Sequence, residues 1–311
     1  MKYSIIFGIA VATPLAGAAI PAKAQDFLSS TECRLEMRVE NSIDWQGLYG
    51  RGYEVFEKEE SFEVANVTIR HEGAACDWFL TGASETGGGS PQLFGPYGTL
   101  VYDVLHTPNG PSLLSPDYTG NQFSRLRGRF GAGAGAQQVT LYIAIPPDQY
   151  VGGGSYSGQA ILRLFRDDLA SPELADQSPL GIIAPVASVL KVESMEAGPG
   201  VRTLNVDLGN LEPGADRTLD FSVRSNALVR ATVQSANRGK LTHRFGAPGI
   251  PYRLAIGDRL VDLTGTTTSE PIAEATPTDL PVPFHIAVDP QPGAAAGNYT
   301  DTLTITFIVD G

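Results

Sequence analysis

The residues of this chain that could do chemistry are few and scattered. Its only two cysteines are Cys33 and Cys76, and neither belongs to a C-x-x-C pair. The four histidines lie at positions 71, 106, 243 and 285. None of them stands at ligand spacing from the cysteines, so the pattern does not favour a metal site. No nucleophile-elbow, zincin, phosphate-loop or dinucleotide-binding motif occurs, and we expect neither an enzymatic activity nor a cofactor.

The amino-terminal segment has the three regions of a secretory signal peptide. Lys2 precedes an apolar run from Ile5 to Ile20, which only small residues and Pro14 interrupt. Ala22-Lys23-Ala24 then forms a small-x-small cleavage site. We expect residues 1–24 to be removed on export.

Charge and length limit what the mature chain can be. Without Lys2 and Lys23 it carries 20 basic and 34 acidic residues, so the formal net charge moves from -12 to -14. An acidic chain argues against nucleic acid as a partner, because phosphate binding relies on a basic surface. No later segment approaches eighteen apolar residues, and we expect no transmembrane segment in the mature chain. Its 287 residues fit two domains of roughly 140 residues each.

Export also indicates the state of the cysteines. In an oxidising compartment Cys33 and Cys76 most simply form one disulfide bond. The loop that it closes has 44 residues, counting both cysteines. Loop-closure entropy makes such a bond worth roughly 4 kcal/mol.

The last fifteen residues, GNYTDTLTITFIVDG, carry the clearest structural pattern of the chain. Leu303, Ile305, Phe307 and Val309 fall on one face, and threonines fall on the other. This alternation predicts a half-buried β-strand, whose free edge must be paired, covered or offered to a partner. A related stretch, GSYSGQAILRLF at 154–165, indicates that the chain contains two copies of one β unit.

The rest of the mature chain predicts an all-β fold. Short alternating stretches are separated by glycine, proline and asparagine turn signals, and no segment has convincing helical periodicity, which is typical of β-sandwiches. We expect an amino-terminal domain over residues 25–166 and a carboxyl-terminal domain over 186–311. The acidic, proline-containing segment 167–185 is predicted to be a linker. Its apolar residues Leu180, Ile182 and Ile183 leave open that part of it closes the first domain.

Longer stretches of the second half carry a family resemblance. The runs are VDLGNLEPGADRTLDFSVRSNALVRATVQSANRGKL, IPYRLAIGDRLVDL and the terminal GNYTDTLTITFIVDG. They resemble the spore coat protein U domain, found in secreted pilus subunits of the archaic, Csu-type chaperone-usher systems of Gram-negative bacteria. The first half is similar through LVYDVL at 100–105, IPPDQYVGGGSYSGQAIL at 145–162 and the cysteine pair.

This resemblance implies immunoglobulin-like sandwiches, the carboxyl-terminal one lacking its final strand. A periplasmic pilus chaperone lends a strand during export, and at the outer-membrane usher a neighbouring pilus subunit replaces it by strand addition to the open edge. By the same resemblance, Leu303, Ile305, Phe307 and Val309 line the groove that receives the donor.

The resemblance also implies a position in the pilus. Major subunits of this type carry a donor extension before their first cysteine, whereas here only QDFLSSTE precedes Cys33. A subunit that accepts a strand but offers none is expected at the tip, as an adhesin that mediates surface attachment or biofilm formation.

Large apolar residues in predicted loops of the first half are candidates for the adhesive surface, whose target the sequence does not identify. They are Trp45, Leu48, Tyr49, Leu93, Phe94, Tyr97 and Tyr118. For any one of them the alternative is packing into a minor core beneath a long loop.

Two other interpretations stay open. The chain could be a self-contained extracellular structural or coat protein, in which an internal segment closes each sandwich. It could also be a carbohydrate-binding module or a secreted hydrolase, although sequence cannot show two carboxylates at the separation that a glycosidase needs.

Overall fold

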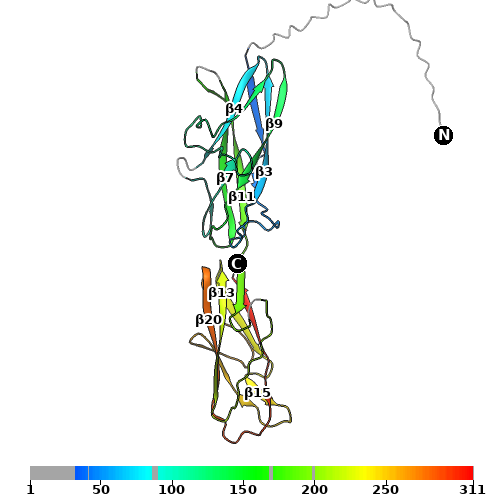
Figure 1. Ribbon diagram of the computed structural model, residues 1–311, viewed down its shortest axis with the longest axis vertical. Helices are drawn as coiled ribbons and strands as arrows, with labels where there is room; N and C mark the ends of the chain where they lie inside the picture. The colour runs from blue at the N-terminus through cyan, green and yellow to red at the C-terminus, as the bar shows by residue number, and fades with distance from the viewer. Residues whose placement is uncertain (1–31, 41, 86–89, 168–170, 198–199, 311) are drawn as a thin grey trace, which may run out of the picture.

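The computed structural model describes residues 32–40, 42–85, 90–167, 171–197 and 200–310. The predicted signal peptide and residues 25–31 lie outside these ranges. The described residues form strands β1 to β22 and no helix, which confirms the all-β prediction, and none forms a helix able to span a membrane. Two units lie end to end along the long axis, the first comprising residues 32–186 and the second residues 189–310 (Figure 1).

The first unit is a sandwich of two sheets. One sheet has the order β1 (Arg34–Val39), β3 (Phe62–Glu72), β9 (Gly135–Ala144) and β7 (Asp103–Leu105). The other has the order β2 (Ser42–Asp44), β11 (Glu173–Val186), β10 (Gly154–Arg166), β4 (Cys76–Ser84) and β8 (Leu126–Phe130). A hairpin of β5 (Gln92–Gly95) and β6 (Gly98–Val101) extends the second sheet by pairing with β10.

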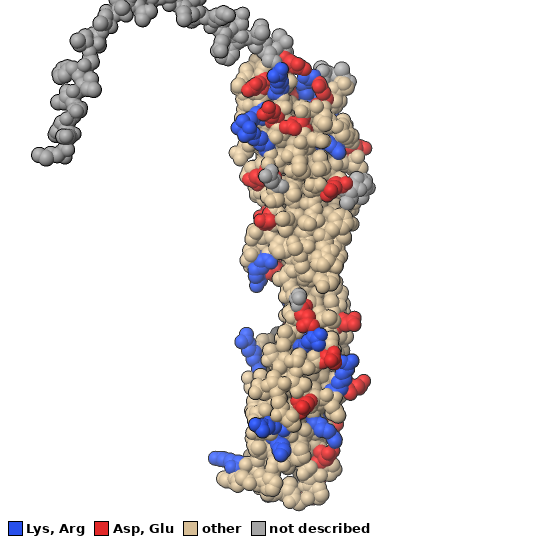
Figure 2. Space-filling view, turned by 180° about the vertical axis from the view of Figure 1, so that it is seen from behind, with Lys and Arg blue, Asp and Glu red and all other residues tan. Residues whose placement is uncertain are grey.

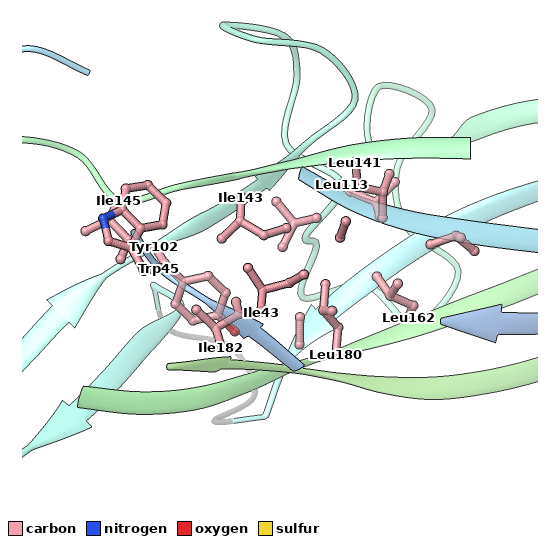
Figure 3. Close-up of a cluster of buried hydrophobic side chains, with 14 of the residues drawn as sticks. Ile43, Trp45, Tyr102, Leu113, Leu141, Ile143, Ile145, Leu162, Leu180 and Ile182 are labelled. Carbon is pink, nitrogen blue, oxygen red and sulfur yellow. The ribbon is translucent and has the colours of Figure 1, made fainter. Parts of the chain in front are cut away.

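Alternation of apolar and polar residues places the core between these sheets. Ala65, Val67 and Ile69 of β3 are fully buried, while the residues between them face outward. Side chains from both layers point toward one another in the close-up, among them Leu141 and Ile143 of one sheet and Leu162, Leu180 and Ile182 of the other (Figure 3). The period-two pattern of the sequence therefore corresponds to a filled core.

The prediction of a linker over residues 167–185 is wrong for most of that segment. Residues 173–186 form β11, which pairs with β10 in antiparallel register from Gly154↔Val186 to Arg166↔Glu173. Leu180 and Ile182 are fully buried, so the apolar residues noted in the sequence do close the first sandwich. Glu173, Pro179 and Pro185 occupy exposed positions of β11, and the half-buried Asp176 accepts a hydrogen bond from the backbone nitrogen of Met37 at 2.7 Å, so a strand can hold the residues that indicated a linker.

The predicted disulfide between Cys33 and Cys76 is present, with 6.1 Å between the Cα atoms. It joins the start of β1 in one sheet to the start of β4 in the other. His71 lies close to both sulfurs, but its Nε2 atom bonds to the Ala74 carbonyl oxygen at 2.7 Å and its ring stacks on Phe130 at 4.9 Å. The sulfurs are used in the covalent bond, so these three residues form a structural cluster.

The second unit is also built from two facing sheets. One sheet has the order β12 (Leu190–Ser194), β13 (Ala215–Ser225), β20 (Thr276–Val288), β17 (Arg253–Ile256) and β18 (Arg259–Val261). Facing it lie β19 (Thr266–Thr268), β14 (Val229–Ser235) and β22 (Leu303–Val309). Three short strands, β15 (Lys240–His243), β16 (Ile250–Pro251) and β21 (Tyr299–Thr300), form a small additional sheet.

Asn226 joins the two units. Its side chain is 1% exposed, and its amide nitrogen donates to the carbonyl oxygens of Val151 at 3.2 Å and Ala187 at 3.1 Å. Its Oδ1 atom accepts a hydrogen bond from the backbone nitrogen of Val189 at 2.7 Å. The Tyr150 hydroxyl adds a hydrogen bond to the Ser225 carbonyl oxygen at 2.8 Å. Buried, satisfied polar contacts of this kind fix the short connection between the units.

The disulfide makes a testable contribution to the first unit alone. Replacing both Cys33 and Cys76 by Ala should lower the free energy of unfolding of the first unit by about 2–5 kcal/mol. The chain's two tryptophans, Trp45 and Trp78, both lie in that unit, so tryptophan fluorescence in a urea titration reports it selectively. An unchanged fluorescence midpoint, or an equal loss in the second unit, would contradict the assignment.

Candidate strand-acceptor edge

The terminal strand β22 is paired on one side only among the described residues. It runs antiparallel to β14, from Leu303↔Ser235 to Val309↔Val229, and ends close to the junction of the units (Figure 1). No described strand pairs with its other side. That side presents a row of backbone N–H and C=O groups, which is the template that strand addition uses.

The first unit shows what the same position looks like when it is filled. Strand β10 holds the place in its unit that β22 holds in the second: β4 pairs with β10 as β14 pairs with β22. On its other side β10 pairs with β11 over the whole length of the strand. Among the described residues the second unit has no counterpart of β11. The two copies that the sequence indicated therefore differ by one strand.

The inward side chains of β10, which has a strand on both sides, are more buried than those of β22, which has a strand on one side only. In β10, Ala160, Leu162 and Leu164 are fully buried. The matching residues of β22 face the second core as predicted, but all are only half-buried; they are Leu303, Ile305, Phe307 and Val309. The adjacent strand β14 is covered on both sides, and its inward residues Val229 and Val233 are fully buried. The apolar side chains of β22 are thus less buried than those of the neighbouring strand β14.

Residues 201–211 form a second half-buried row on the same core. Leu204, Val206 and Leu208 alternate with exposed residues and pack against the second hydrophobic cluster. The segment continues from β12, the edge strand that lies beside β22. Although its side chains alternate like a strand, the described part of the chain provides no backbone pairing for residues 201–208. We call β22 together with residues 201–211 the acceptor edge.

Three aromatic rings lie beneath the acceptor edge. Phe307 of β22 lies 5.5 Å from Phe221 and 6.0 Å from Phe284, measured between ring centroids, and the latter two lie 5.0 Å apart. Phe284 is fully buried, whereas Phe221 and Phe307 are half-buried. An apolar side chain of a strand added beside β22 would cover the exposed parts of these rings.

Asp301 fixes the start of β22. Its carboxylate accepts hydrogen bonds from the hydroxyls of Ser235 and Tyr252, each at 2.6 Å, and from the backbone nitrogen of Asn237 at 2.9 Å. Burial, together with the hydrogen bond to Asp301, raises the pKa of Tyr252 far above its ordinary value. The tyrosine therefore stays a neutral donor, and the charged acceptor makes these bonds strong.

The candidate adhesive residues do not gather in one place. Trp45 and Leu93 are 1% and 0% exposed and belong to the first core, so their prediction as adhesive residues is wrong. Glycine and proline around them indicate loops, but their side chains turn inward. The remaining candidates are exposed: Leu48, Tyr49, Phe94, Tyr97 and Tyr118.

These five residues occupy three separate segments. Leu48 and Tyr49 follow β2, and Phe94 and Tyr97 belong to the hairpin of β5 and β6; both segments lie toward the junction. Tyr118 lies in the loop before β8 and packs edge-on against Phe165 at 5.7 Å. Phe123 of that loop is 72% exposed, although no pattern in the sequence marks it. The far end of the first unit is instead charged (Figure 2), with ion pairs such as Arg129–Asp77.

Comparison with solved structures finds chaperone-usher tip adhesins among the similar chains. A chain of the CsuC–CsuE chaperone–tip adhesion subunit pre-assembly complex of Acinetobacter baumannii Csu pili shares 13% identity at a TM-score of 0.39, over 88% of this chain and 99% of that one. The CupB6 tip adhesin of Pseudomonas aeruginosa shares 12% identity at a TM-score of 0.39, over 88% of this chain and 93% of that one. A chain of a chaperone–tip adhesin complex of CFA/I fimbriae shares 13% identity at a TM-score of 0.34, over 89% of this chain and 84% of that one.

No protein-family model matches the chain, and no curated protein matches it in sequence. At such identities and TM-scores the similarity does not transfer a function. The functional conclusion therefore depends on the acceptor edge itself.

The hydrogen bonds of Asp301 lead to a prediction for the second unit. Asp301→Ala leaves the hydroxyls of Ser235 and Tyr252 without their acceptor and should lower the free energy of unfolding of that unit by about 3 kcal/mol. Asp301→Asn keeps one acceptor oxygen and should lose less. Far-UV circular dichroism during urea unfolding measures both, with tryptophan fluorescence marking the first unit. An unchanged unfolding midpoint of the second unit in Asp301→Ala would show that the carboxylate does not hold the edge.

Proposed function

We propose that this protein is an exported pilus subunit of a chaperone-usher system, and that it accepts a donor strand on the acceptor edge of its second unit. Its partners would be a periplasmic chaperone, an outer-membrane usher and a neighbouring subunit. In the assembled fimbria it would be a tip adhesin, with the first unit presenting the attachment surface. No enzymatic step is part of this function.

The observation that carries the proposal is the difference between β10 and β22. The chain contains its own filled example: β11 pairs with β10 and buries Leu180, Ile182 and Val186 between the sheets. A strand added antiparallel to β22 would supply the same two things to the second unit, namely backbone partners for an open edge and apolar side chains for a half-buried core.

Apolar burial gives the added strand its driving force. Each inward side chain that becomes fully covered contributes on the order of 25 cal/mol for every Å² removed from water. The half-buried side chains of β22 and of residues 201–211 pack against the same core, and a strand added beside β22 would bury those of β22 further. An alternating donor matches this arrangement, because every second side chain of a strand points to the same face.

The proposed attachment surface is less defined than the acceptor edge. Its support is the exposure of large apolar side chains on loops of the first unit, of which Tyr97 at 70% and Phe123 at 72% are the most exposed. Exposed apolar patches on secreted proteins mark interaction sites. Because these residues lie on separate segments, we expect them to contribute separately to attachment, and no single substitution should abolish it.

The acceptor role can be tested with the chain's own strand. A copy of residues 167–186 appended after Gly311 would carry β11 and the six residues that connect it to β10. It should fold onto β22 and raise the unfolding temperature of the second unit, because a segment that binds only the native state stabilises it. The tryptophan-detected transition of the first unit should not change.

Two single substitutions provide matched controls. Ile305→Lys places a charge on the inward face of β22 and should abolish the stabilisation by the appended strand, whereas Thr304→Lys on the exposed face should preserve it. Should the appended strand stabilise neither unit, and a donor peptide from a neighbouring pilus subunit also fail, the second unit would be a complete fold. The coat-protein interpretation would then replace this one.

A further inference from the structure

The junction between the two units shows where a closing strand leads the chain that follows it. β11 runs antiparallel to β10, so its last residue, Val186, pairs with Gly154 at the start of β10. The second unit follows directly, because β12 begins at Leu190. It therefore lies against the end of the first unit at which β10 begins (Figure 1).

The loop before β10 takes part in this contact between the units. The Tyr150 hydroxyl of that loop donates to the Ser225 carbonyl oxygen at 2.8 Å. Phe56 of the first unit lies nearby and receives two cations of the second, with the Arg224 guanidinium carbon 4.9 Å and the Lys191 nitrogen 5.4 Å from the centre of its ring. The strand that closes the first unit thus leads into a folded body that covers an aromatic side chain and the loop before the paired strand.

The second unit has the same loop in an exposed position. Tyr156 and Tyr299 match in the two copies of the β unit, and counting back from them aligns residues 150–153 with residues 293–296. Residues 292–298 are all exposed. β22 ends close to the junction, so its start and this loop lie toward the opposite end of the second unit (Figure 1). A strand added antiparallel to β22, as β11 is to β10, would leave the unit at that end.

An exposed phenylalanine lies beside this loop. Phe245 is 83% exposed, the highest value among the large apolar side chains of the described residues. It belongs to the turn after β15, in which the backbone nitrogen of Gly246 donates to the His243 carbonyl oxygen at 3.1 Å. β15 pairs with β21 in the register His243↔Tyr299, which places the turn next to the loop that precedes β22.

The two segments brace each other. The ring of His243 lies 4.8 Å from the ring of Tyr299 and 5.9 Å from that of Phe245. The Tyr299 hydroxyl donates to the Ala295 carbonyl oxygen at 3.2 Å. A Cβ atom at Gly297 would lie 2.1 Å from His243 Nε2, so the close approach of the loops requires glycine there. Contacts already made in the free chain need not be ordered on binding, which favours association.

These segments are also poor in charge. No charged residue occurs from 290 to 300, and Arg244 is the only one from 244 to 251. Few charged side chains lie at this end of the molecule, in contrast to the opposite end of the first unit (Figure 2). Depletion of charge around an aromatic residue and an arginine is typical of the core of a protein–protein interface.

We propose that residues 244–249 and 290–298, the pole surface, dock the folded body of the subunit that donates its strand to β22. The direction of an antiparallel donor decides the occupant, because the donor chain leaves the acceptor edge at this end and its body must follow there. Phe245 would be covered by that body, as Phe56 is covered by the second unit. The inference rests on the proposed acceptor role and adds a second contact to it.

The test compares two probes on the immobilised full chain by biolayer interferometry. One probe is a synthetic peptide of the donor extension of a neighbouring pilus subunit, and the other is that complete subunit. Phe245→Ser should weaken binding of the complete subunit about tenfold and leave binding of the peptide unchanged. Ala296→Glu places a charge in the uncharged loop and should act in the same way.

Leu260→Ser is the matched control. It removes a 73% exposed apolar side chain from β18, outside the pole surface, and should bind both probes like wild type. An equal loss of peptide binding in Phe245→Ser would overturn the inference, because the residue would then act on the acceptor edge itself.

The remaining outcomes separate this inference from the acceptor role. Binding of both probes that neither Phe245→Ser nor Ala296→Glu affects would overturn the docking surface and leave the acceptor edge in place. Binding of neither probe to the wild-type chain would overturn both. Dimerisation of the wild-type chain that Phe245→Ser abolishes, with subunit binding unchanged, would assign the surface to a second copy and would also overturn the inference.

Discussion

Backbone hydrogen bonding is the constraint on which the second unit depends. A strand in a sandwich needs partners on both sides or an edge that water, charge or another chain can cover. β22 has β14 on one side, and on the other its backbone groups are open among the described residues, beside a row of half-buried apolar side chains. Apolar side chains at such an edge contribute less to the stability of the folded unit than fully buried ones, because they lose only part of their contact with water.

The first unit solves the same problem within the chain. Its extra strand β11 pairs along β10 and continues toward the second unit, so one segment both closes a core and joins the units. The junction is then tightened by Asn226, which bonds to residues on either side of it. The first unit is therefore closed by a strand of its own chain, whereas the second unit has an open edge among the described residues.

The sequence allowed the fold class, the disulfide and the inward face of β22 to be predicted, because period-two alternation and a single cysteine pair depend on local chemistry alone. It did not allow β11 to be recognised, since exposed prolines and the half-buried Asp176, which bonds to the backbone of β1, hide a strand whose apolar inward residues are buried. Trp45 and Leu93 were misassigned for a similar reason: turn residues show where the backbone bends, not where the neighbouring side chain points.

The most direct measurement of the central claim is amide hydrogen exchange of β22, followed with and without an added donor strand. If the edge is open, the amides of β22 that pair with β14 are protected, while the alternate amides exchange rapidly and become protected only when the donor is present. Residues 202–208 should gain protection at the same time. Uniform protection of all β22 amides in the chain alone, equal to that of β20, would show that the edge is already covered and would contradict the account.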